Sequence, residues 1–363
     1  MKKVDSDLLI ITPNLESGGA ERVAVSVARE AVRRRRRVAL LSIYPALGAL
    51  RGGLDSEVDV IELASGNIFR KIVEMRRFLS GFDGEILSCQ RKTNVLVGFV
   101  ALTLRRTWRK LLFREASTFE AVNNKMLLKR WLYLLLMRLA YLSADKIIAN
   151  SVATRSDVLR YLGVDGTKVV AIPNPVLTEN YKILITEPLH DSFFERDVKV
   201  LINIGRLEGV KGQFILLKVL ERLINIDRSF RLVLIGSGSL KSTFEAVLVE
   251  NDLREYVKFI EFSDNVYKYL GRSSLYLFSS LWEGFGNVLV ESLACGTPIV
   301  GFECHGGAVD VIKSSSEGVL IKERSVDSMV NEIELYFAKG APRDTVDVSQ
   351  YRVDSVYDMY FGL

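Results

Sequence analysis

The feature that most constrains this chain is a repeated alternation between short apolar runs and longer stretches with helical spacing. Leu8–Ile11 is apolar throughout. It is followed by a loop, a helix-like stretch from Ala20 to about Val32, and a second apolar run at Val38–Ile43. Such runs between helices indicate strands buried on both faces of a parallel sheet. Because crossovers between parallel strands are right-handed, the pattern predicts an α/β fold.

The alternation continues through both halves of the chain. It predicts further strands near 85–88, 110–113, 146–149, 169–172, 198–204, 231–235, 257–260, 275–278, 298–301 and 318–321. Pro173–Pro175 interrupts regular structure, and the polar segment Val176–Asp197 is expected to be an irregular connection. With 363 residues, 48% of them hydrophobic, the chain exceeds what one compact domain buries. We expect two Rossmann-like domains, 1–176 and 177–345, and a last helix within about 346–363.

Charge is distributed unevenly along the chain. Residues 1–175 carry 29 Lys/Arg against 17 Asp/Glu, or +12, whereas residues 176–363 carry 20 against 27, or −7. A basic first half suggests an anionic partner, such as a membrane surface, a pyrophosphate-linked acceptor or nucleic acid, or else ordinary surface charge. Cys89, Cys295 and Cys304 lack paired spacing, which fits a reducing compartment and argues against a zinc site or disulfide framework.

The chain shows no targeting or membrane-spanning signal in its sequence. Leu8–Ile11 is too short for a signal peptide, and no run approaches the roughly 18 apolar residues of a span. We therefore expect a cytoplasmic protein. Leu104–Lys110 is basic with an indole, and Lys125–Arg138 mixes cations, aromatics and leucines. The second stretch is either a helix at the inner membrane face or a core helix with a basic outer face.

Two acids bracket a glycine-containing loop that follows the strand near 275–278. Glu283 precedes the next helix and Glu291 lies about one turn inside it. Amides at a helix start bind anions, and carboxylates accept hydrogen bonds from hydroxyls. The two acids could therefore grip two parts of one ligand, such as sugar and ribose hydroxyls. The alternative is a surface loop whose acids favour the helix dipole.

Two cations follow the strand that ends at Ile204. Arg206 and Lys211 stand in the next loop, where ligands of open α/β sheets bind. Arg and Lys there suit a diphosphate, although solvated loop cations are the alternative. Gly18 and Gly19 open the first helix and offer a weaker anion or sugar contact. Asp5-Ser6-Asp7 matches a metal-binding DxD pattern but precedes the first strand, so we expect no metal there.

Several of these motifs together resemble glycosyltransferase family 4, whose members are retaining enzymes of the GT-B fold. They occur in this order: Gly18–Arg22, Asp145–Ser151, Ile172–Asn174, Gly205–Gly212, Glu283–Glu291 and Ala294–Pro298. The resemblance covers nearly the whole chain. It implies two Rossmann-like domains with parallel sheets facing a central cleft. The first would bind the acceptor, the second the nucleotide sugar, and the last helix would rejoin the first.

The resemblance also implies roles for individual residues. Arg206 and Lys211 would hold the donor diphosphate. Glu283 would contact the donor sugar, and Glu291 would hold the ribose. The remaining implied substrate contacts come from backbone amides and from the first-domain glycines: Phe285, Gly286, Asn287, Val288, Gly18 and Gly19.

The implied activity is transfer of a hexose or N-acetylhexosamine, with UDP as the expected donor nucleotide. The expected acceptor is a lipid-linked saccharide in cell-surface polysaccharide synthesis, such as lipopolysaccharide or capsule. The departing phosphate would take the acceptor proton, so we expect neither a cofactor nor a metal. We expect no nucleic-acid partner. A GT-B epimerase, or a non-catalytic nucleotide-sugar-binding component of an assembly complex, is the alternative.

The chain departs from the family pattern in two places. Many relatives have a histidine after the first-domain strand near 115, where this chain has Arg114-Glu115-Ala116-Ser117. Glu115 is a candidate substitute that binds substrate, and a salt-bridged loop acid is the alternative. Asp310 stands where relatives usually have Glu. We expect it to keep the same role, anchoring the domain near the donor, with a side chain that reaches less far.

Overall fold

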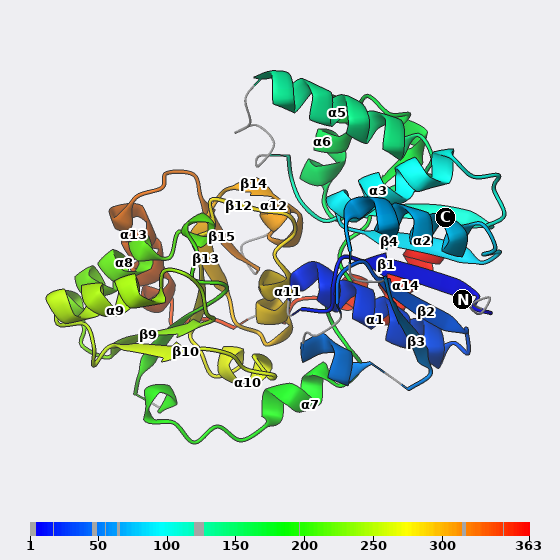
Figure 1. The fold of residues 1–363 in the computed structure, drawn as a ribbon. Coiled ribbons are helices and arrows are strands. Elements are labelled where there is room, and N and C mark those ends of the chain that lie inside the picture. The colour runs from blue at the N-terminus through cyan, green and yellow to red at the C-terminus, as the bar shows by residue number, and fades with distance from the viewer. Residues whose placement is uncertain are drawn as a thin grey trace. The chain divides into compact units, whose positions relative to one another are not determined.

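The computed structural model describes residues 5–363 except 17, 46–48, 55, 64–65, 120–126, 196, 314–316 and 344. The described chain divides into two compact units (Figure 1). Unit 1 comprises residues up to Thr178 together with Gln350–Leu363, and unit 2 comprises Glu179–Ser349. Each unit is built around its own parallel sheet, and each is described by itself below.

Unit 1 contains a seven-stranded sheet in the order β3-β2-β1-β4-β5-β6-β7. All of its strand pairs are parallel, and Leu8 of β1 lies between Val38 of β2 and Glu85 of β4. The strands are β1 (Leu8–Thr12), β2 (Val38–Ser42), β3 (Val58–Glu62), β4 (Glu85–Cys89), β5 (Lys110–Glu115), β6 (Lys146–Ala149) and β7 (Val169–Ala171). This is the doubly wound order, with its switch point between β1 and β4.

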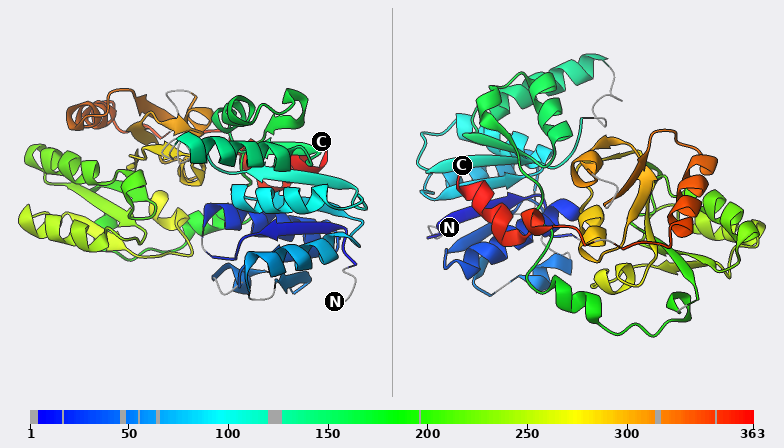
Figure 2. Two further views of the ribbon diagram at one scale, coloured as in Figure 1. Left: turned by 45° about the horizontal axis from the view of Figure 1, so that its top comes forward. Right: turned by 180° about the vertical axis from the view of Figure 1, so that it is seen from behind.

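Helices cover both faces of this sheet. One core joins the sheet to the helices α2 (Ile68–Leu79), α3 (Arg91–Leu102), α5 (Leu127–Tyr141) and α6 (Val152–Leu162). The other joins it to α1 (Gly19–Arg33) and α14 (Val353–Phe361). Figure 2 shows α14, in red, against the strands of unit 1. The alternating side chains of each strand supply these two cores.

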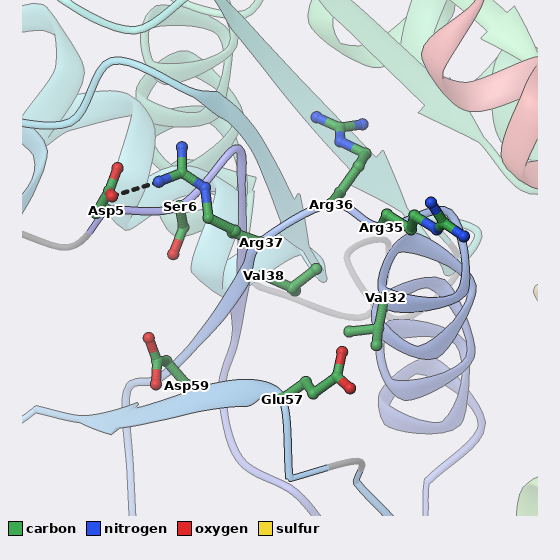
Figure 3. Close-up of a pocket in the computed structure, with 9 residues that line it drawn as sticks. All are labelled: Asp5, Ser6, Val32, Arg35, Arg36, Arg37, Val38, Glu57 and Asp59. Atoms are coloured by element: carbon green, nitrogen blue, oxygen red, sulfur yellow. Dashed lines mark ion pairs between the residues drawn. The ribbon is translucent and has the colours of Figure 1, made fainter.

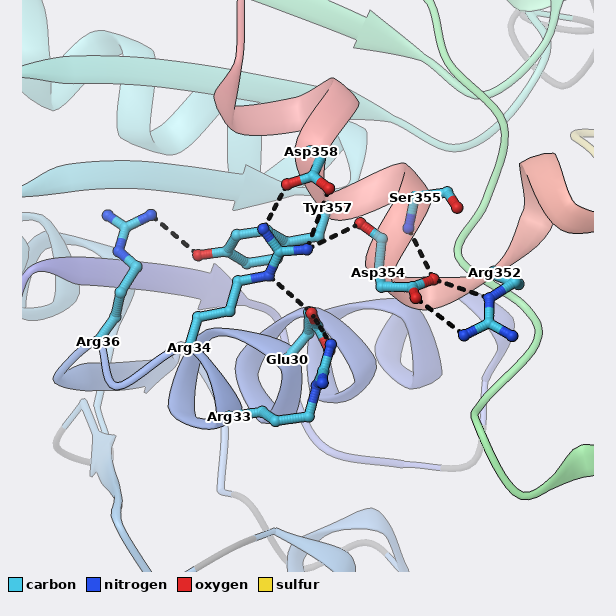
Figure 4. A network of polar contacts seen from close by, with 9 residues as sticks. All are labelled: Glu30, Arg33, Arg34, Arg36, Arg352, Asp354, Ser355, Tyr357 and Asp358. Atoms are coloured by element: carbon cyan, nitrogen blue, oxygen red, sulfur yellow. Dashed lines mark hydrogen bonds and ion pairs between the residues drawn. The ribbon is translucent and has the colours of Figure 1, made fainter.

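The C-terminal helix is fixed to unit 1 by both apolar and polar contacts. Val356, Tyr357 and Tyr360 are buried, while charged residues of its outer side meet the end of α1 (Figure 4). Arg34 bonds Glu30 at 2.7 Å and pairs with Asp358. Arg34, one of the five consecutive arginines 33–37, is thus paired with two internal acids.

Unit 2 contains a six-stranded parallel sheet in the order β10-β9-β8-β11-β13-β15. Its strands are β8 (Lys199–Ile204), β9 (Phe230–Ile235), β10 (Val257–Ile260), β11 (Leu275–Phe278), β13 (Ile299–Phe302) and β15 (Gly318–Ile321). Two short strands, β12 (Trp282–Glu283) and β14 (His305–Gly306), pair separately. Its helices are α7 (Tyr181–Thr186), α8 (Phe214–Ile226), α9 (Lys241–Glu250), α10 (Tyr267–Leu270), α11 (Asn287–Ala294), α12 (Ala308–Val311) and α13 (Val326–Ala338).

The predicted α/β class and parallel sheets are confirmed, with three local corrections. The sequence pattern missed β3, a strand at the sheet edge that pairs only with β2 and in which only Val58 is buried. The segment Val176–Asp197 was expected to be irregular but contains α7, which packs on α10. The indole of Trp108, in the basic stretch proposed for a membrane face, is only 6% exposed and belongs to the core.

Candidate functional site

The loop after β8 carries Lys211 to the end of the neighbouring strand β11. Gly212 has φ +60°, and a Cβ there would lie 2.4 Å from the carbonyl oxygen of Ser279. Glycine therefore allows the loop to lie directly against the chain that leaves β11. The Ser279 hydroxyl donates to the Lys211 carbonyl at 2.8 Å and fixes this contact.

Lys211 and Glu283 form the central contact of the site. The Nζ of Lys211 lies 2.5 Å from Oε2 of Glu283, and each side chain is 22% exposed. The Ser280 hydroxyl donates to the same carboxylate oxygen at 3.3 Å. Two residues that the sequence analysis had taken from separate motifs therefore meet in one half-buried ion pair. A cation and an acid that remain accessible to solvent can both contact a polar ligand.

A second glycine holds the Glu283 backbone in place. Glu283 pairs with Gly306 in the two-stranded β12–β14 ladder. Gly306 has φ +141°, and a Cβ there would lie 1.6 Å from the Glu283 carbonyl oxygen. Any other side chain would push the two strands apart, because real Cβ atoms do not approach a carbonyl oxygen this closely. In the sequence analysis, the stretch containing Gly306 was considered only for Asp310.

The helix α11 begins at Asn287, directly after the loop. Gly286 is its N-cap residue, Phe285 is buried, and Glu291 is 9% exposed on the second turn. Burial, together with the charges of Glu283 and Glu291, raises the pKa of the Tyr276 phenol. Burial and the charge of Glu283 also raise the pKa of Cys304 to about 11. The negative charges of Glu283 and Glu291 thus both disfavour ionisation of one buried phenol on β11.

Arg206 lies at the end of β8 and is exposed. The neighbouring Glu208 accepts hydrogen bonds from the amide and hydroxyl of Ser239 at 3.0 and 2.9 Å. These bonds lower the pKa of the Glu208 carboxyl, and the charge of Arg206 contributes. Because β8 and β11 are adjacent and their connections leave in opposite directions, Arg206, Lys211 and Glu283 lie at a topological switch point.

The structure adds residues that the sequence did not indicate. Arg324 follows β15, donates to the carbonyls of Ser279 and Ser280, and stacks over Phe302 at 4.8 Å. Gln213 is 2% exposed and donates to Asn203 at 3.0 Å. Arg324 thus holds the chain that leaves β11, and Gln213 holds the end of β8. Arg324 is 44 residues from Ser280 in sequence, so no local pattern could have linked them.

The predicted residues of unit 1 lie in different surroundings. Gly18 caps α1, and Gly19 is its first residue. Glu115 is 1% exposed. The Tyr141 hydroxyl donates to its carboxylate at 2.6 Å, and Arg91 pairs with it at 3.1 Å. These contacts favour the ion-paired role of Glu115 over substrate binding.

A pocket of about 390 Å³ lies at the amino ends of the unit 1 strands (Figure 3). It is lined by Asp5, Ser6, Val32, Arg35, Arg36, Arg37, Val38, Glu57 and Asp59. Both acids of the DxD pattern pair with one cation, since Arg37 contacts Asp5 and lies 3.0 Å from Asp7. Across the described ranges there is no group of three or more His, Cys, Asp or Glu that could hold a metal ion.

Comparison with protein families gives two matches that together span nearly the whole chain. The model described as Glycosyltransferase Family 4 matches residues 17–180, and the model described as Glycosyl transferases group 1 matches residues 187–347. The boundary between the matches lies near the division between units 1 and 2.

Two Campylobacter jejuni proteins are among the similar sequences. One, "N-acetylgalactosamine-N,N'-diacetylbacillosaminyl-diphospho-undecaprenol 4-alpha-N-acetylgalactosaminyltransferase", is 29% identical over 69% of this chain and 65% of its own length. The other, "GalNAc-alpha-(1->4)-GalNAc-alpha-(1->3)-diNAcBac-PP-undecaprenol alpha-1,4-N-acetyl-D-galactosaminyltransferase", is 26% identical over 90% of this chain and 87% of its own length. This chain therefore spans slightly less than two thirds of the first relative.

Among solved structures, the Anabaena protein HepE in complex with UDP-glucose has a TM-score of 0.76 to this chain. It is 19% identical, and the match covers 98% of this chain and 95% of HepE. WaaG, "a glycosyltransferase involved in lipopolysaccharide biosynthesis", has a TM-score of 0.74 at 15% identity, over 98% of this chain and 100% of WaaG. These likenesses establish the GT-B fold.

Proposed function

Because this chain belongs to glycosyltransferase family 4, we propose that it is a retaining enzyme that transfers a sugar from a nucleotide diphosphate donor to a saccharide acceptor. The contact between Lys211 and Glu283 carries the proposal. It places a cation and a carboxylate 2.5 Å apart at the switch point of unit 2, both partly open to solvent. Open α/β sheets bind nucleotides at this position.

Each side chain of the site has a proposed part in donor binding. Arg206 and Lys211 bind the diphosphate, because guanidinium and ammonium groups suit phosphate oxygens. Glu283 accepts from donor-sugar hydroxyls, and Glu291 accepts from the ribose. The amides of residues 285–288 at the start of α11 contribute partial positive charge near the sugar and phosphate.

The proposed chemistry depends on stabilising a leaving group. When the bond between the sugar and the diphosphate breaks, negative charge grows on the departing phosphate oxygen. We expect Arg206, Lys211 and the α11 amides to stabilise this charge without a metal ion. The acceptor hydroxyl oxygen forms the new bond to the anomeric carbon on the face from which the diphosphate leaves, so the configuration of the sugar is retained. The departing phosphate oxygen takes the proton of that hydroxyl, and no side-chain base is needed.

UDP is the proposed donor nucleotide, and a lipid-linked saccharide the proposed acceptor. The support comes from the relatives: HepE was solved with UDP-glucose, and both Campylobacter enzymes are named for undecaprenol-linked acceptors. Within the described ranges, no helix combines the length and apolar character needed to cross a bilayer. We propose a cytoplasmic enzyme that works at the inner membrane face, in surface polysaccharide synthesis.

The test begins with binding of UDP-, GDP- and ADP-sugars by calorimetry and continues with product analysis. Incubation of the bound donor with undecaprenyl-diphosphate-linked saccharides should give a product whose anomeric configuration matches that of the donor. Sugar isomerisation with donor alone would indicate an epimerase. Donor binding without transfer or hydrolysis would indicate a non-catalytic component, and an inverted product would refute the retaining mechanism.

A further inference from the structure

The outer face of α5 is an apolar stripe. Six large apolar side chains of α5 and the residue after it are between 37% and 63% exposed; this α5 stripe comprises Trp131, Leu132, Leu135, Leu136, Leu139 and Leu142. Among residues 131–142, the other residue that is equally open to solvent is Arg138. A contiguous apolar surface of this kind on a soluble protein marks an interaction site.

Helical geometry explains why the stripe is continuous. Its members recur at spacings of three and four residues, so they share one side of the helix. The opposite side supplies Met137, Ala140 and Tyr141 to the unit 1 core, each with no exposed surface. α5 is therefore apolar on both sides, although one side faces solvent. Packing within unit 1 accounts only for the buried side.

The other basic segments of unit 1 are engaged in internal contacts. Trp108 is buried, and Arg106 pairs with Asp145 at 2.8 Å. In the run after α1, Arg36 pairs with Glu85 at 2.5 Å, and Arg37 lies 3.0 Å from Asp7. Arg106, Arg36 and Arg37 are therefore paired with acids of unit 1, whereas no packing within unit 1 accounts for the exposed side of α5.

We propose that the α5 stripe inserts into the surface of an anionic phospholipid bilayer. The charge around it fits this partner: among residues 130–142 the charged side chains are Arg130 and Arg138, and both are cations. With 15 residues, α5 is shorter than the roughly 20 needed for a span, so it lies in the plane of the interface.

This inference adds a membrane-binding surface to the proposed function and rests on that function only for the link to a lipid-linked acceptor. It also specifies the kind of contact. Because leucines and one tryptophan form the stripe, insertion is mainly hydrophobic, and the flanking cations add selectivity for anionic lipid. Salt screens the contribution of the cations but not that of the stripe.

The experiment uses the full chain and vesicles of phosphatidylcholine with about 30% phosphatidylglycerol, a composition that mimics an anionic leaflet. Trp131, 63% exposed, is a built-in probe. Its emission should shift to shorter wavelength on binding and be quenched by brominated lipids, and Trp131→Phe should remove that part of the signal. The test variant is Leu135→Ser/Leu139→Ser. The matched control, Ile183→Ser/Val249→Ser, changes two apolar residues of unit 2 that are 69% and 50% exposed.

The stripe variant should bind vesicles at least about tenfold more weakly, since two leucines no longer enter the interface, while the control binds as wild type. Most wild-type binding should persist in about 0.5 M NaCl, where exposed charges are strongly screened. Equal binding by the stripe variant, loss of wild-type binding in salt, or no vesicle binding at all would each overturn the proposal.

A second measurement separates this inference from other occupants and from the proposed function. If sedimentation shows a wild-type dimer that the stripe variant makes monomeric, the stripe binds a second copy and the proposal is wrong. Transfer to a detergent-soluble acceptor analogue should be unchanged in the stripe variant. If transfer is absent in wild type while vesicle binding follows the stripe, the proposed function fails and this inference stands.

Discussion

Removal of the Lys211 ammonium is the sharpest test of the unit 2 site. In the free protein this group neutralises Glu283 at 2.5 Å, and both side chains are 22% exposed. Lys211→Ala should therefore have two effects on the bound donor. It removes one stabiliser of the leaving diphosphate, which is typically worth about 3 kcal/mol, or about 10²- to 10³-fold in rate. It also leaves the Glu283 carboxylate unpaired beside the phosphates.

That second effect gives the test its specificity. Like charges about 5 Å apart repel by about 3 kcal/mol at an effective dielectric constant of about 20. Glu283→Gln alone should lower transfer about 10²-fold, because a sugar contact is weakened. In the double variant the repulsion is gone, so we expect its kcat/KM to be no lower than that of Lys211→Ala. The two single effects should not add, as expected for residues in contact.

The assay is kcat/KM from nucleotide release, completed by a double-mutant cycle. Lys199→Ala is the matched control, because Lys199 forms an ion pair with Asp227 at 2.7 Å elsewhere in unit 2. Loss of this exposed pair should change stability by less than about 1 kcal/mol and leave kcat/KM nearly unchanged. If Lys211→Ala keeps a kcat/KM within about threefold of wild type, or if the two single effects multiply in the double variant, the site assignment is refuted.

Three further predictions concern the Gly306 contact with Glu283, the need for a metal ion, and the pH dependence of stability. Gly306→Ala should lower kcat/KM at least about tenfold, because its Cβ would lie 1.6 Å from the Glu283 carbonyl oxygen. Gly296 also has a positive φ, +66°, but a Cβ there would meet no atom within 4 Å, so Gly296→Ala should lower the free energy of unfolding by only about 1 kcal/mol, as measured by thermal unfolding. Equal losses of activity in Gly306→Ala and Gly296→Ala would contradict the role given to Gly306. Chelation with EDTA should leave transfer unchanged, and a loss restored by Mg²⁺ would reveal a metal step. Hydrogen bonds from Arg352 lower the pKa of Asp354 to about 2. The ionised carboxylate therefore contributes to the free energy of unfolding above its unfolded pKa near 4, and this contribution should disappear as the pH falls toward 2. Acid titration of unfolding should show the loss in wild type and no such contribution in Asp354→Asn.

The sequence by itself determined the order and class of the secondary elements. Four predicted strands, including Val257–Ile260 and Leu275–Phe278, have the bounds found in the structure. Buried parallel strands are continuous apolar runs, and such runs are visible without tertiary information. The pattern failed where burial is incomplete, as in the edge strand Val58–Glu62, and where a short helix, Tyr181–Thr186, lies in a polar segment. Local signals are weak in both cases.

The candidate site was only partly visible in the sequence. Arg206, Lys211, Glu283 and Glu291 were predicted because each follows a predicted strand or lies near the start of a helix, where ligand groups of α/β folds gather. The direct contact between Lys211 and Glu283 was not visible, since the two residues are 72 positions apart. Nor was the role of Gly306, which depends on a close approach of two separate chain segments.

Only the tertiary structure decided which side chains are free to act. The fold places Glu115, a candidate substrate contact, in contact with Arg91 and Tyr141, which the sequence did not indicate. The basic first half of the chain suggested an anionic partner, but two of its arginines, Arg34 and Arg36, pair with acids that are distant in sequence. α5, in contrast, was expected to have a basic outer face if it belonged to the core, and that face proved to be apolar. Periodicity records the types of residue on a helix, whereas burial and pairing depend on neighbours that only the folded chain supplies.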